Sequence, residues 1–104
     1  MDKETSVTAR RFAEAVRHRI RIKRILLFGS RARGDHFVTS DYDFIVVSDD
    51  FKGVPFVERA APLYECWDAT ADMEALCYTA DEWRRLKDRR GILLNAQRDG
   101  VEIA

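Results

Sequence analysis

Two apolar runs joined by a polar segment constrain the fold of this chain more than any other feature. Residues 25–28 and 42–47 have the length and apolar character of strands buried in a sheet. The pair Gly29–Ser30 follows the first run, and Asp41 and Asp43 lie at the start of the second. Because side chains alternate across a strand, these two aspartates face the same side. The stretch therefore predicts two strands whose connection begins with Gly-Ser and ends with a carboxylate pair.

The carboxylate pair predicts a binding site for a hard cation. The two carboxylates lie at the start of an apolar strand, so they repel each other and lose part of their hydration. Both effects are unfavourable unless a cation lies between the carboxylates. Oxygen ligands suit Mg²⁺, which proteins commonly bind through one or two carboxylates together with substrate phosphates. Gly29 permits close approach of a ligand to the backbone, and the free N–H groups of a helix that begins at Ser30 favour phosphate.

The spacing of these motifs resembles a known family. Gly29–Ser30 is followed by ten residues, 31–40, and then by an Asp-x-Asp sequence. This pattern resembles the nucleotidyltransferase superfamily that includes DNA polymerase beta and the aminoglycoside nucleotidyltransferases, and more narrowly the minimal nucleotidyltransferases. The tail from Tyr78 to Ala104 is also similar to that family. The alternative is a plain loop with a serine cap and two surface aspartates, which would not require both motifs at this spacing.

Further site residues follow from the resemblance. An arginine after the Gly-Ser pair could form a charge-assisted fork with the γ-phosphate of a nucleotide. Arg31 is the preferred candidate because it adjoins Ser30, whereas Arg33 fits a phosphate contact or a solvated helix face equally well. Family members place a third carboxylate on the strand beside the Asp-x-Asp strand. Asp72 and Glu74 are both candidates for it.

The predicted third strand, residues 71–78, leaves that choice open. Asp72 and Glu74 lie two residues apart and share a face of the strand. Glu74 is favoured because it lies deeper in the strand, whereas Asp72 could end the preceding loop. The alternative is that both are exposed acids on an edge strand.

Composition agrees with one small enzyme domain spanning residues 1–104. The 18 basic and 18 acidic residues cancel, which argues against a general nucleic-acid binder. Cys66 and Cys77 form no CxxC pair, so we expect reduced thiols and a cytoplasmic location. No apolar run approaches the roughly 18 residues of a membrane helix.

The remaining pattern predicts an α/β fold of the α+β type, with a small mixed sheet of three to four strands and helices mainly on one face. A first helix is expected from Thr5 or Ser6 to Arg19, with an apolar stripe. A second is expected after Pro55, kinked or restarted at Pro62. Residues 79–82 form a capping box before another helix. Gly91 interrupts the pattern that follows, Gly100 would cap a last helix, and residues 101–103 would form a short strand.

The resemblance also implies a reaction and a partner. It implies Mg²⁺-dependent transfer of AMP from ATP to a hydroxyl, with a second Mg²⁺ near the third carboxylate. Because the chain lacks the acceptor domain of antibiotic-modifying relatives, we expect a separate protein acceptor. Minimal nucleotidyltransferases are often paired with HEPN-domain RNase toxins, as MntA-type antitoxins that add AMP to a toxin tyrosine. The alternatives are a stand-alone enzyme acting on a small-molecule hydroxyl and an antitoxin acting by binding alone. The oligomeric state is left open.

Overall fold

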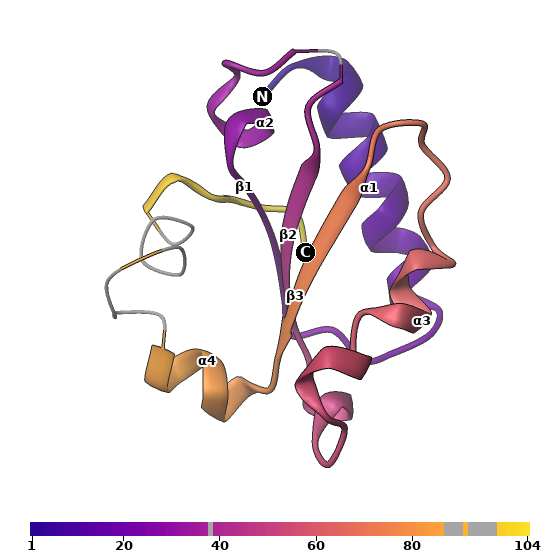
Figure 1. The fold of residues 1–104 in the computed structure, drawn as a ribbon, viewed down its shortest axis with the longest axis vertical. Helices are drawn as coiled ribbons and strands as arrows, with labels where there is room; N and C mark the ends of the chain where they lie inside the picture. The colour runs from indigo at the N-terminus through magenta and orange to yellow at the C-terminus, as the bar shows by residue number, and fades with distance from the viewer. Residues whose placement is uncertain (38, 87–90, 92–97) are drawn as a thin grey trace.

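A four-stranded mixed sheet forms the centre of the molecule (Figure 1). The computed structural model describes residues 1–37, 39–86, 91 and 98–104. The strands are β1 (Arg24–Phe28), β2 (Tyr42–Val47), β3 (Met73–Tyr78) and β4 (Val101–Glu102), in the order β3-β2-β1-β4. β1 pairs antiparallel with β2 and β4, and β2 pairs parallel with β3. The expected fold class and the two central strands are thereby confirmed.

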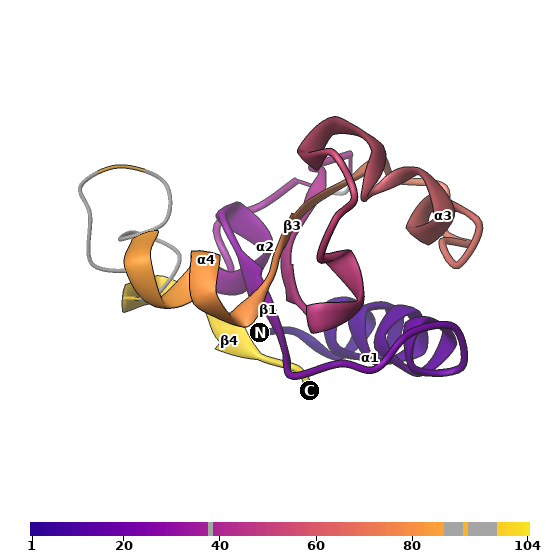
Figure 2. The same cartoon turned by 90° about the horizontal axis from the view of Figure 1, so that it is seen from below.

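One face of the sheet is covered by α1 (Lys3–Arg17) and α3 (Ala61–Tyr64). The apolar stripe of α1 is buried, and the rings of Phe12 and Phe44 lie 4.6 Å apart. Leu63 of α3 belongs to the same cluster and is 1% exposed. Figure 2 shows both helices on one side of the sheet and α4 (Ala80–Leu86) on the other. The helices are thus unevenly distributed, as the sequence predicts.

On the second face of the sheet, the described residues form a smaller apolar cluster with α4. Leu26, Ile45 and Tyr78 form a small cluster there with Trp83 of α4. α4 begins with the predicted capping box: the backbone N–H of Glu82 donates to Oγ1 of Thr79, and the Thr79 N–H donates to Oε1 of Glu82. Phe28, which is in register with Asp43 at the start of β2, also belongs to this cluster, so the beginning of the strand lies at the edge of the cluster.

The boundaries of two elements differ from prediction. α1 begins at Lys3 rather than near Thr5 or Ser6, because Asp2 is the N-cap and accepts a hydrogen bond of 2.7 Å from the Thr5 N–H. The helix ends at Arg17, two residues before the expected Arg19. β3 begins at Met73, so Ala71 and Asp72 belong to the preceding loop.

The connection between β2 and β3 contains only short helices. Two 3-10 turns, Asp49–Phe51 and Phe56–Glu58, precede α3, and Pro62 lies in the first turn of α3. The predicted restart at Pro62 is therefore confirmed. The expected helix over residues 92–96 lies outside the described residues, but Arg98 and Asp99 are helical and Gly100 follows them. In the described part of the chain, no helix is both long and apolar enough to cross a membrane.

A buried ion pair links this connection to α4, and the sequence analysis missed it. Arg59 is 8% exposed, and its Nη1 donates to Oε1 of Glu82 at 2.6 Å and to the carbonyl of Cys77 at 3.2 Å. The guanidinium, followed by the Thr79 backbone N–H, lowers the pKa of Glu82 to about 2 from its ordinary value of 4.5. A carboxyl with a lowered folded-state pKa stabilises the fold above its ordinary pKa and loses that effect on acidification.

We expect Glu82→Gln to lower the free energy of unfolding by about 2 kcal/mol at pH 7. The difference from the wild type should shrink as the pH falls from about 4.5 towards about 2, because the wild-type carboxyl then becomes protonated. Urea unfolding at several pH values measures this. The exposed Asp81→Asn, which breaks only the surface pair with Arg84, is the control and should change stability by less than about 0.5 kcal/mol. Equal effects of the two variants would contradict the assignment.

Candidate active site

The Gly-Ser motif forms a tight turn between β1 and α2 (Ser30–Arg33). Gly29 adopts a positive φ of 77°, and Gly34 ends α2 in the left-handed conformation. A Cβ added to Gly29 would lie 2.7 Å from Oδ2 of Asp43, closer than any side chain tolerates. Glycine is therefore required for its backbone conformation and for the close approach of the carboxylate.

Sheet register brings two of the predicted carboxylates together. Asp43 lies opposite Phe28 in the antiparallel pair and opposite Glu74 in the parallel pair. Residues in register share a face, so Asp43 and Glu74 lie on the face of Phe28, away from α1. Asp41 precedes β2 by one residue. Since Phe28 ends β1, these carboxylates lie beside the Gly29 turn.

The electrostatics of Asp43 identify it as the centre of this group. Its pKa is raised, first by burial and then by the negative charges of Glu74 and Asp41. Burial and like charges both disfavour the ionised carboxylate, and a bound cation would relieve both effects. Asp43 is half-buried, whereas Asp41 and Glu74 are exposed.

Asp72 lies beside this group without joining it. It is exposed, lies in the loop before β3, and its carbonyl accepts a 2.9 Å hydrogen bond from the N–H of Tyr42. A cavity of about 410 Å³ opens here, lined by Thr39, Thr70, Ala71 and Asp72. The two threonines were not predicted. Their only signal in the sequence is that each lies two residues before an acidic candidate, Asp41 or Asp72.

The two predicted phosphate-binding arginines lie in different environments. Arg33 is exposed and forms an ion pair of 3.2 Å with Asp35. Arg31 is only 2% exposed, and its guanidinium carbon lies 4.3 Å from the centroid of the Tyr42 ring. The structure therefore places Arg33 at the surface of α2 and Arg31 inside the fold, which does not agree with the preference for Arg31 as the phosphate contact.

The residues present fit a hard divalent cation. In the part of the chain that the structure describes, no three His, Cys, Asp or Glu side chains form a ready-made metal site. Two carboxylates beside a glycine turn match instead the Mg²⁺ sites in which substrate phosphates and water complete the coordination. The raised pKa of Asp43 and the close approach of Gly29 to its Oδ2 are the structural observations that support this fit.

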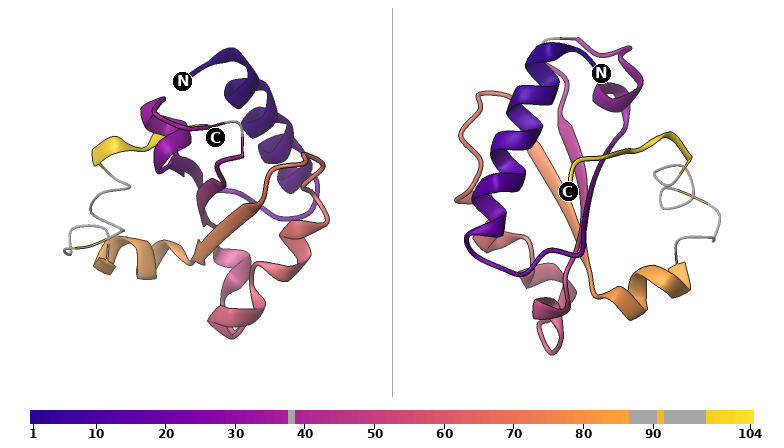
Figure 3. Two further views of the ribbon diagram at one scale, coloured as in Figure 1. Left: turned by 45° about the horizontal axis from the view of Figure 1, so that its top comes forward. Right: turned by 180° about the vertical axis from the view of Figure 1, so that it is seen from behind.

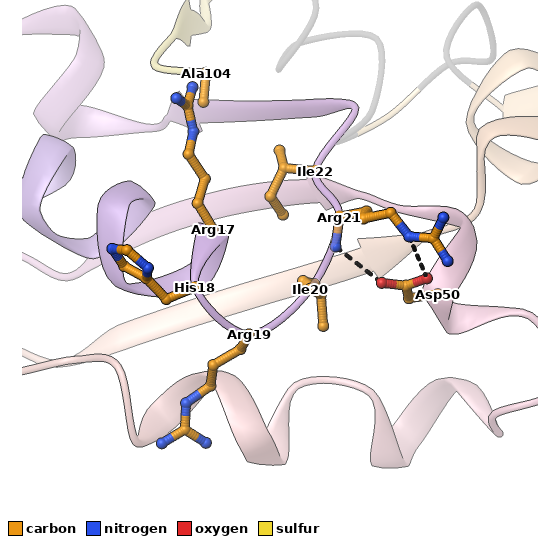
Figure 4. A pocket seen from close by; sticks show the side chains of 8 residues that line it. All are labelled: Arg17, His18, Arg19, Ile20, Arg21, Ile22, Asp50 and Ala104. Carbon is orange, nitrogen blue, oxygen red and sulfur yellow. Dashed lines mark hydrogen bonds and ion pairs between the residues drawn. The ribbon is translucent and has the colours of Figure 1, made fainter.

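A large hollow lies at the opposite end of the sheet. Its volume is about 630 Å³, and its lining includes Ile22 before β1 and Asp50 after β2. Figure 4 shows the side chains of Arg17 and Arg19 extending in opposite directions, while Arg21 is bonded to Asp50. Because its charged groups diverge or are paired, this hollow does not present a converging set of groups comparable with the carboxylates.

Comparison with known proteins identifies the class. A family model described as "Nucleotidyltransferase domain" matches residues 9–98. The chain therefore belongs to the nucleotidyltransferase domain family.

Two individual proteins are similar to the chain. A crystal structure of a "putative nucleotidyltransferase" from Sulfolobus solfataricus superposes with a TM-score of 0.64 and 24% identity, covering 95% of this chain and 82% of that one. At this identity the likeness shows the fold. The Methanocaldococcus jannaschii protein named "Putative protein adenylyltransferase MJ0604" is 54% identical over 33 residues, which are 32% of this chain and 33% of that protein. The match thus spans a third of that relative's length.

We expect Glu74→Gln to reduce nucleotidyl transfer far more than Asp72→Asn does. Glu74 lies in register with Asp43, whereas Asp72 lies in the loop and contacts Tyr42 only through its backbone carbonyl. A lost acid–base residue lowers rates by about 10²–10⁴-fold. Activity measured on both variants, with circular dichroism to confirm folding, tests this. The opposite ranking would mean that Asp72, two residues before Glu74, is the third carboxylate.

Proposed function

We propose that this chain transfers AMP from ATP to a hydroxyl group in a reaction that depends on Mg²⁺. The observation that carries the proposal is the half-buried Asp43, with a raised pKa, flanked by Asp41 and Glu74 and facing the Gly29 turn. Carboxylates that lie beside the Gly29 turn suit the binding of a metal-bound triphosphate. Membership of the nucleotidyltransferase domain family supports the same chemistry.

Asp41 and Asp43 are the residues that would hold the metal of the nucleotide, and Glu74 is the carboxylate that would adjoin a second metal ion. When bound, Mg²⁺ neutralises charge on the phosphates and lowers the pKa of a coordinated hydroxyl. The missing side chain of Gly29 leaves room for the Asp43 carboxylate beside the turn, and the Ser30 hydroxyl can donate to the phosphates. Arg33, exposed on the same short helix, is the arginine positioned to reach them. The leaving pyrophosphate would thus meet fixed donors and positive charge.

Glu74 would accept the proton of the attacking hydroxyl. It is exposed, while its register partner Asp43 is half-buried, so an acceptor can reach it from solvent. In an in-line displacement the nucleophile attacks from the side opposite the leaving group. β1 with its Gly29 turn lies on one side of β2 and β3 lies on the other, and this arrangement supports an acceptor that approaches from the side of Glu74.

For the acceptor we propose a protein tyrosine, on a HEPN-type RNase toxin that this chain silences as an antitoxin. The name of the archaeal relative, a protein adenylyltransferase, supports a protein acceptor. The zero formal net charge gives no continuous basic track for a nucleic-acid acceptor. Phosphate charge on an RNA-binding surface would repel the RNA backbone, which would explain how modification silences an RNase.

Intact mass spectrometry tests this function. The protein is incubated with ATP, Mg²⁺ and a HEPN RNase encoded beside it, and the toxin should gain mass in whole AMP units on a tyrosine. Toxin RNase activity should fall in parallel. The double variant Asp41→Asn with Asp43→Asn should lose both effects.

Each other outcome selects a different function. Full neutralisation by the double variant would show that binding alone silences the toxin. An unmodified toxin, together with ATP consumption in the presence of a small hydroxyl compound, would show a stand-alone enzyme. Equal ATP affinity with and without Mg²⁺ in calorimetry would reject the metal site itself.

A further inference from the structure

Arg31 has an environment that its position beside the Gly-Ser motif does not explain. It directly follows Ser30, yet it is 2% exposed. A buried guanidinium is unfavourable unless hydrogen bonds and opposite dipoles compensate for the lost water. Its contacts therefore indicate what the fold uses it for.

The guanidinium of Arg31 contacts both residues that flank Asp41. Its Nε donates to the carbonyl oxygen of Ser40 at 3.3 Å, and its guanidinium carbon lies 4.3 Å from the ring centroid of Tyr42. Tyr42 is itself 2% exposed, so its ring is a fixed support for the cation. Asp41 thus lies between two positions held by one side chain.

The other end of the guanidinium contacts the first turn of α1. Nη1 donates to Oγ1 of Thr5 at 3.3 Å, and Thr5 is fully buried. In the right view of Figure 3, the start of α1 and α2 lie at the same end of the molecule. Arg31 therefore connects the first turn of the longest helix to the segment that carries Asp41.

A second contact joins the same two parts of the chain. Nε2 of His36 lies 2.8 Å from Oδ2 of Asp2, while the backbone N–H of Thr5 donates to Oδ1 of the same aspartate. The connection between α2 and β2 is thus attached to the start of α1 at two points. His36 contacts Asp2 from within the connection, and Arg31 joins Ser40, near the end of the connection, to Thr5.

Asp41 has no such support from its own side chain. It is exposed, and within the described ranges it forms no ion pair. Its position therefore depends on the backbone of Ser40 and Tyr42. We infer that Arg31 is a positioning residue: it fixes the Asp41 backbone against Thr5 of α1 and so sets the distance between the two carboxylates of the proposed metal pair.

This inference rests on the proposed function only in taking Asp41 as a metal ligand. It separates the two arginines of α2 by role. Arg33 would contact the triphosphate directly, whereas Arg31 would act through Asp41. A direct contact of Arg31 with phosphate would require its guanidinium to leave Thr5, Ser40 and the Tyr42 ring.

The test compares Arg31→Met with Arg33→Met. Mn²⁺ binding, followed by electron paramagnetic resonance without any acceptor, should weaken about tenfold or more in Arg31→Met because a ligand displaced by about 1 Å loses its geometry. In turnover assays at Mg²⁺ concentrations that saturate the variant, kcat should fall about 100-fold with little change in KM for ATP. Arg33→Met should instead raise KM for ATP and leave Mn²⁺ binding in the absence of nucleotide unchanged. Arg11→Met, which removes an exposed arginine paired with Asp68, is the control and should change neither quantity.

A second pair of variants guards against misfolding of Arg31→Met. Thr5→Val removes the hydroxyl acceptor at nearly constant volume and should weaken Mn²⁺ binding in the same direction, while Thr5→Ser should restore it. Hydrogen exchange of the Tyr42 amide, which donates to the Asp72 carbonyl, reports local order whether or not the protein transfers AMP. We expect faster exchange at Tyr42 in Arg31→Met and Thr5→Val.

Three results would overturn the inference. A raised KM for ATP in Arg31→Met with unchanged Mn²⁺ binding would make Arg31 a phosphate contact. A lowered melting temperature with unchanged Mn²⁺ binding and kcat would make it a stability residue only. Unchanged exchange at Tyr42 in both variants would show that Arg31 does not hold this segment. A wild type that binds Mn²⁺ but transfers no AMP would instead reject the proposed function and leave the positioning role intact.

Discussion

Replacing Asp43 with asparagine is expected to remove nucleotidyl transfer while raising the melting temperature of the metal-free protein. Burial, Glu74 and Asp41 raise the pKa of Asp43, so its ionised form is less favourable in the fold than in the unfolded chain. The metal-free protein therefore loses stability as the pH rises through that raised pKa, and a neutral isostere avoids the loss. Activity should fall about a thousandfold, because metal coordination supplies several kcal/mol of transition-state stabilisation.

Calorimetric melting and transfer assays on the same samples measure both effects. The stability gain of Asp43→Asn should be present at pH 7 and diminish as the pH falls towards the ordinary aspartate pKa of 3.8, because the carboxyl is then protonated in the folded and the unfolded chain alike. Asp68→Asn is a matched control with the opposite sign: its hydrogen bond with Arg11 lowers the pKa of Asp68, so its removal should destabilise the protein slightly and leave activity unchanged. A destabilised Asp43→Asn would mean that the carboxylate serves the fold rather than a ligand.

Replacing Gly29 with alanine is expected to reduce activity about 100-fold, the effect of displacing a reacting group by about 1 Å. The added methyl group would lie 2.7 Å from Oδ2 of Asp43, so the carboxylate or the turn must shift. The positive φ of Gly29 adds backbone strain of about 1–2 kcal/mol. Activity, Mn²⁺ binding and urea unfolding should be measured together.

Gly53 provides the control that separates strain from displacement. Its φ of 79° matches that of Gly29, but a Cβ there would meet nothing within 4 Å. Gly53→Ala should therefore also lose stability through its positive φ and keep full activity. Equal activity losses in both variants would attribute the effect of Gly29→Ala to general destabilisation, and normal activity in Gly29→Ala would show that the turn does not form part of the site.

The strands that carry the motifs could be predicted from sequence because their signals are local. The apolar runs after Arg24 and Tyr42 correspond to β1 and β2, and the capping box at Thr79 begins α4 as expected. The start of α1 could not be predicted, because several neighbouring residues can serve as an N-cap and only packing selects Asp2. The start of β3 was ambiguous for a similar reason, since an alternating pattern does not reveal where pairing begins.

The roles of individual arginines were the least predictable part of the site. Arg31 and Arg33 lie two residues apart in one short helix, yet one is buried and the other exposed. Sequence spacing shows that they point in different directions, but not that the first turn of α1 covers one of them. Arg59 was missed because its partner Glu82 is distant in sequence and their contact depends on the tertiary fold. The third carboxylate remained a choice of two for the same reason: the register with Asp43 exists only once β2 and β3 pair.

The strand connections also imply an order in which the site assembles during folding. Phe28 and Asp43 meet by closing a loop of about 15 residues, whereas Asp43 and Glu74 require closure over about 30. Each doubling of loop length adds only about 0.6 kcal/mol of closure entropy, but a parallel pair also needs the whole β2–β3 crossover to be in place. A partly folded chain would therefore hold the Gly-Ser turn against the aspartate pair before Glu74 joins them. Such an intermediate could bind a nucleotide but would lack Glu74, the carboxylate proposed to deprotonate the acceptor. Pairing of β2 with β3 would therefore be the folding step that makes the site catalytically competent.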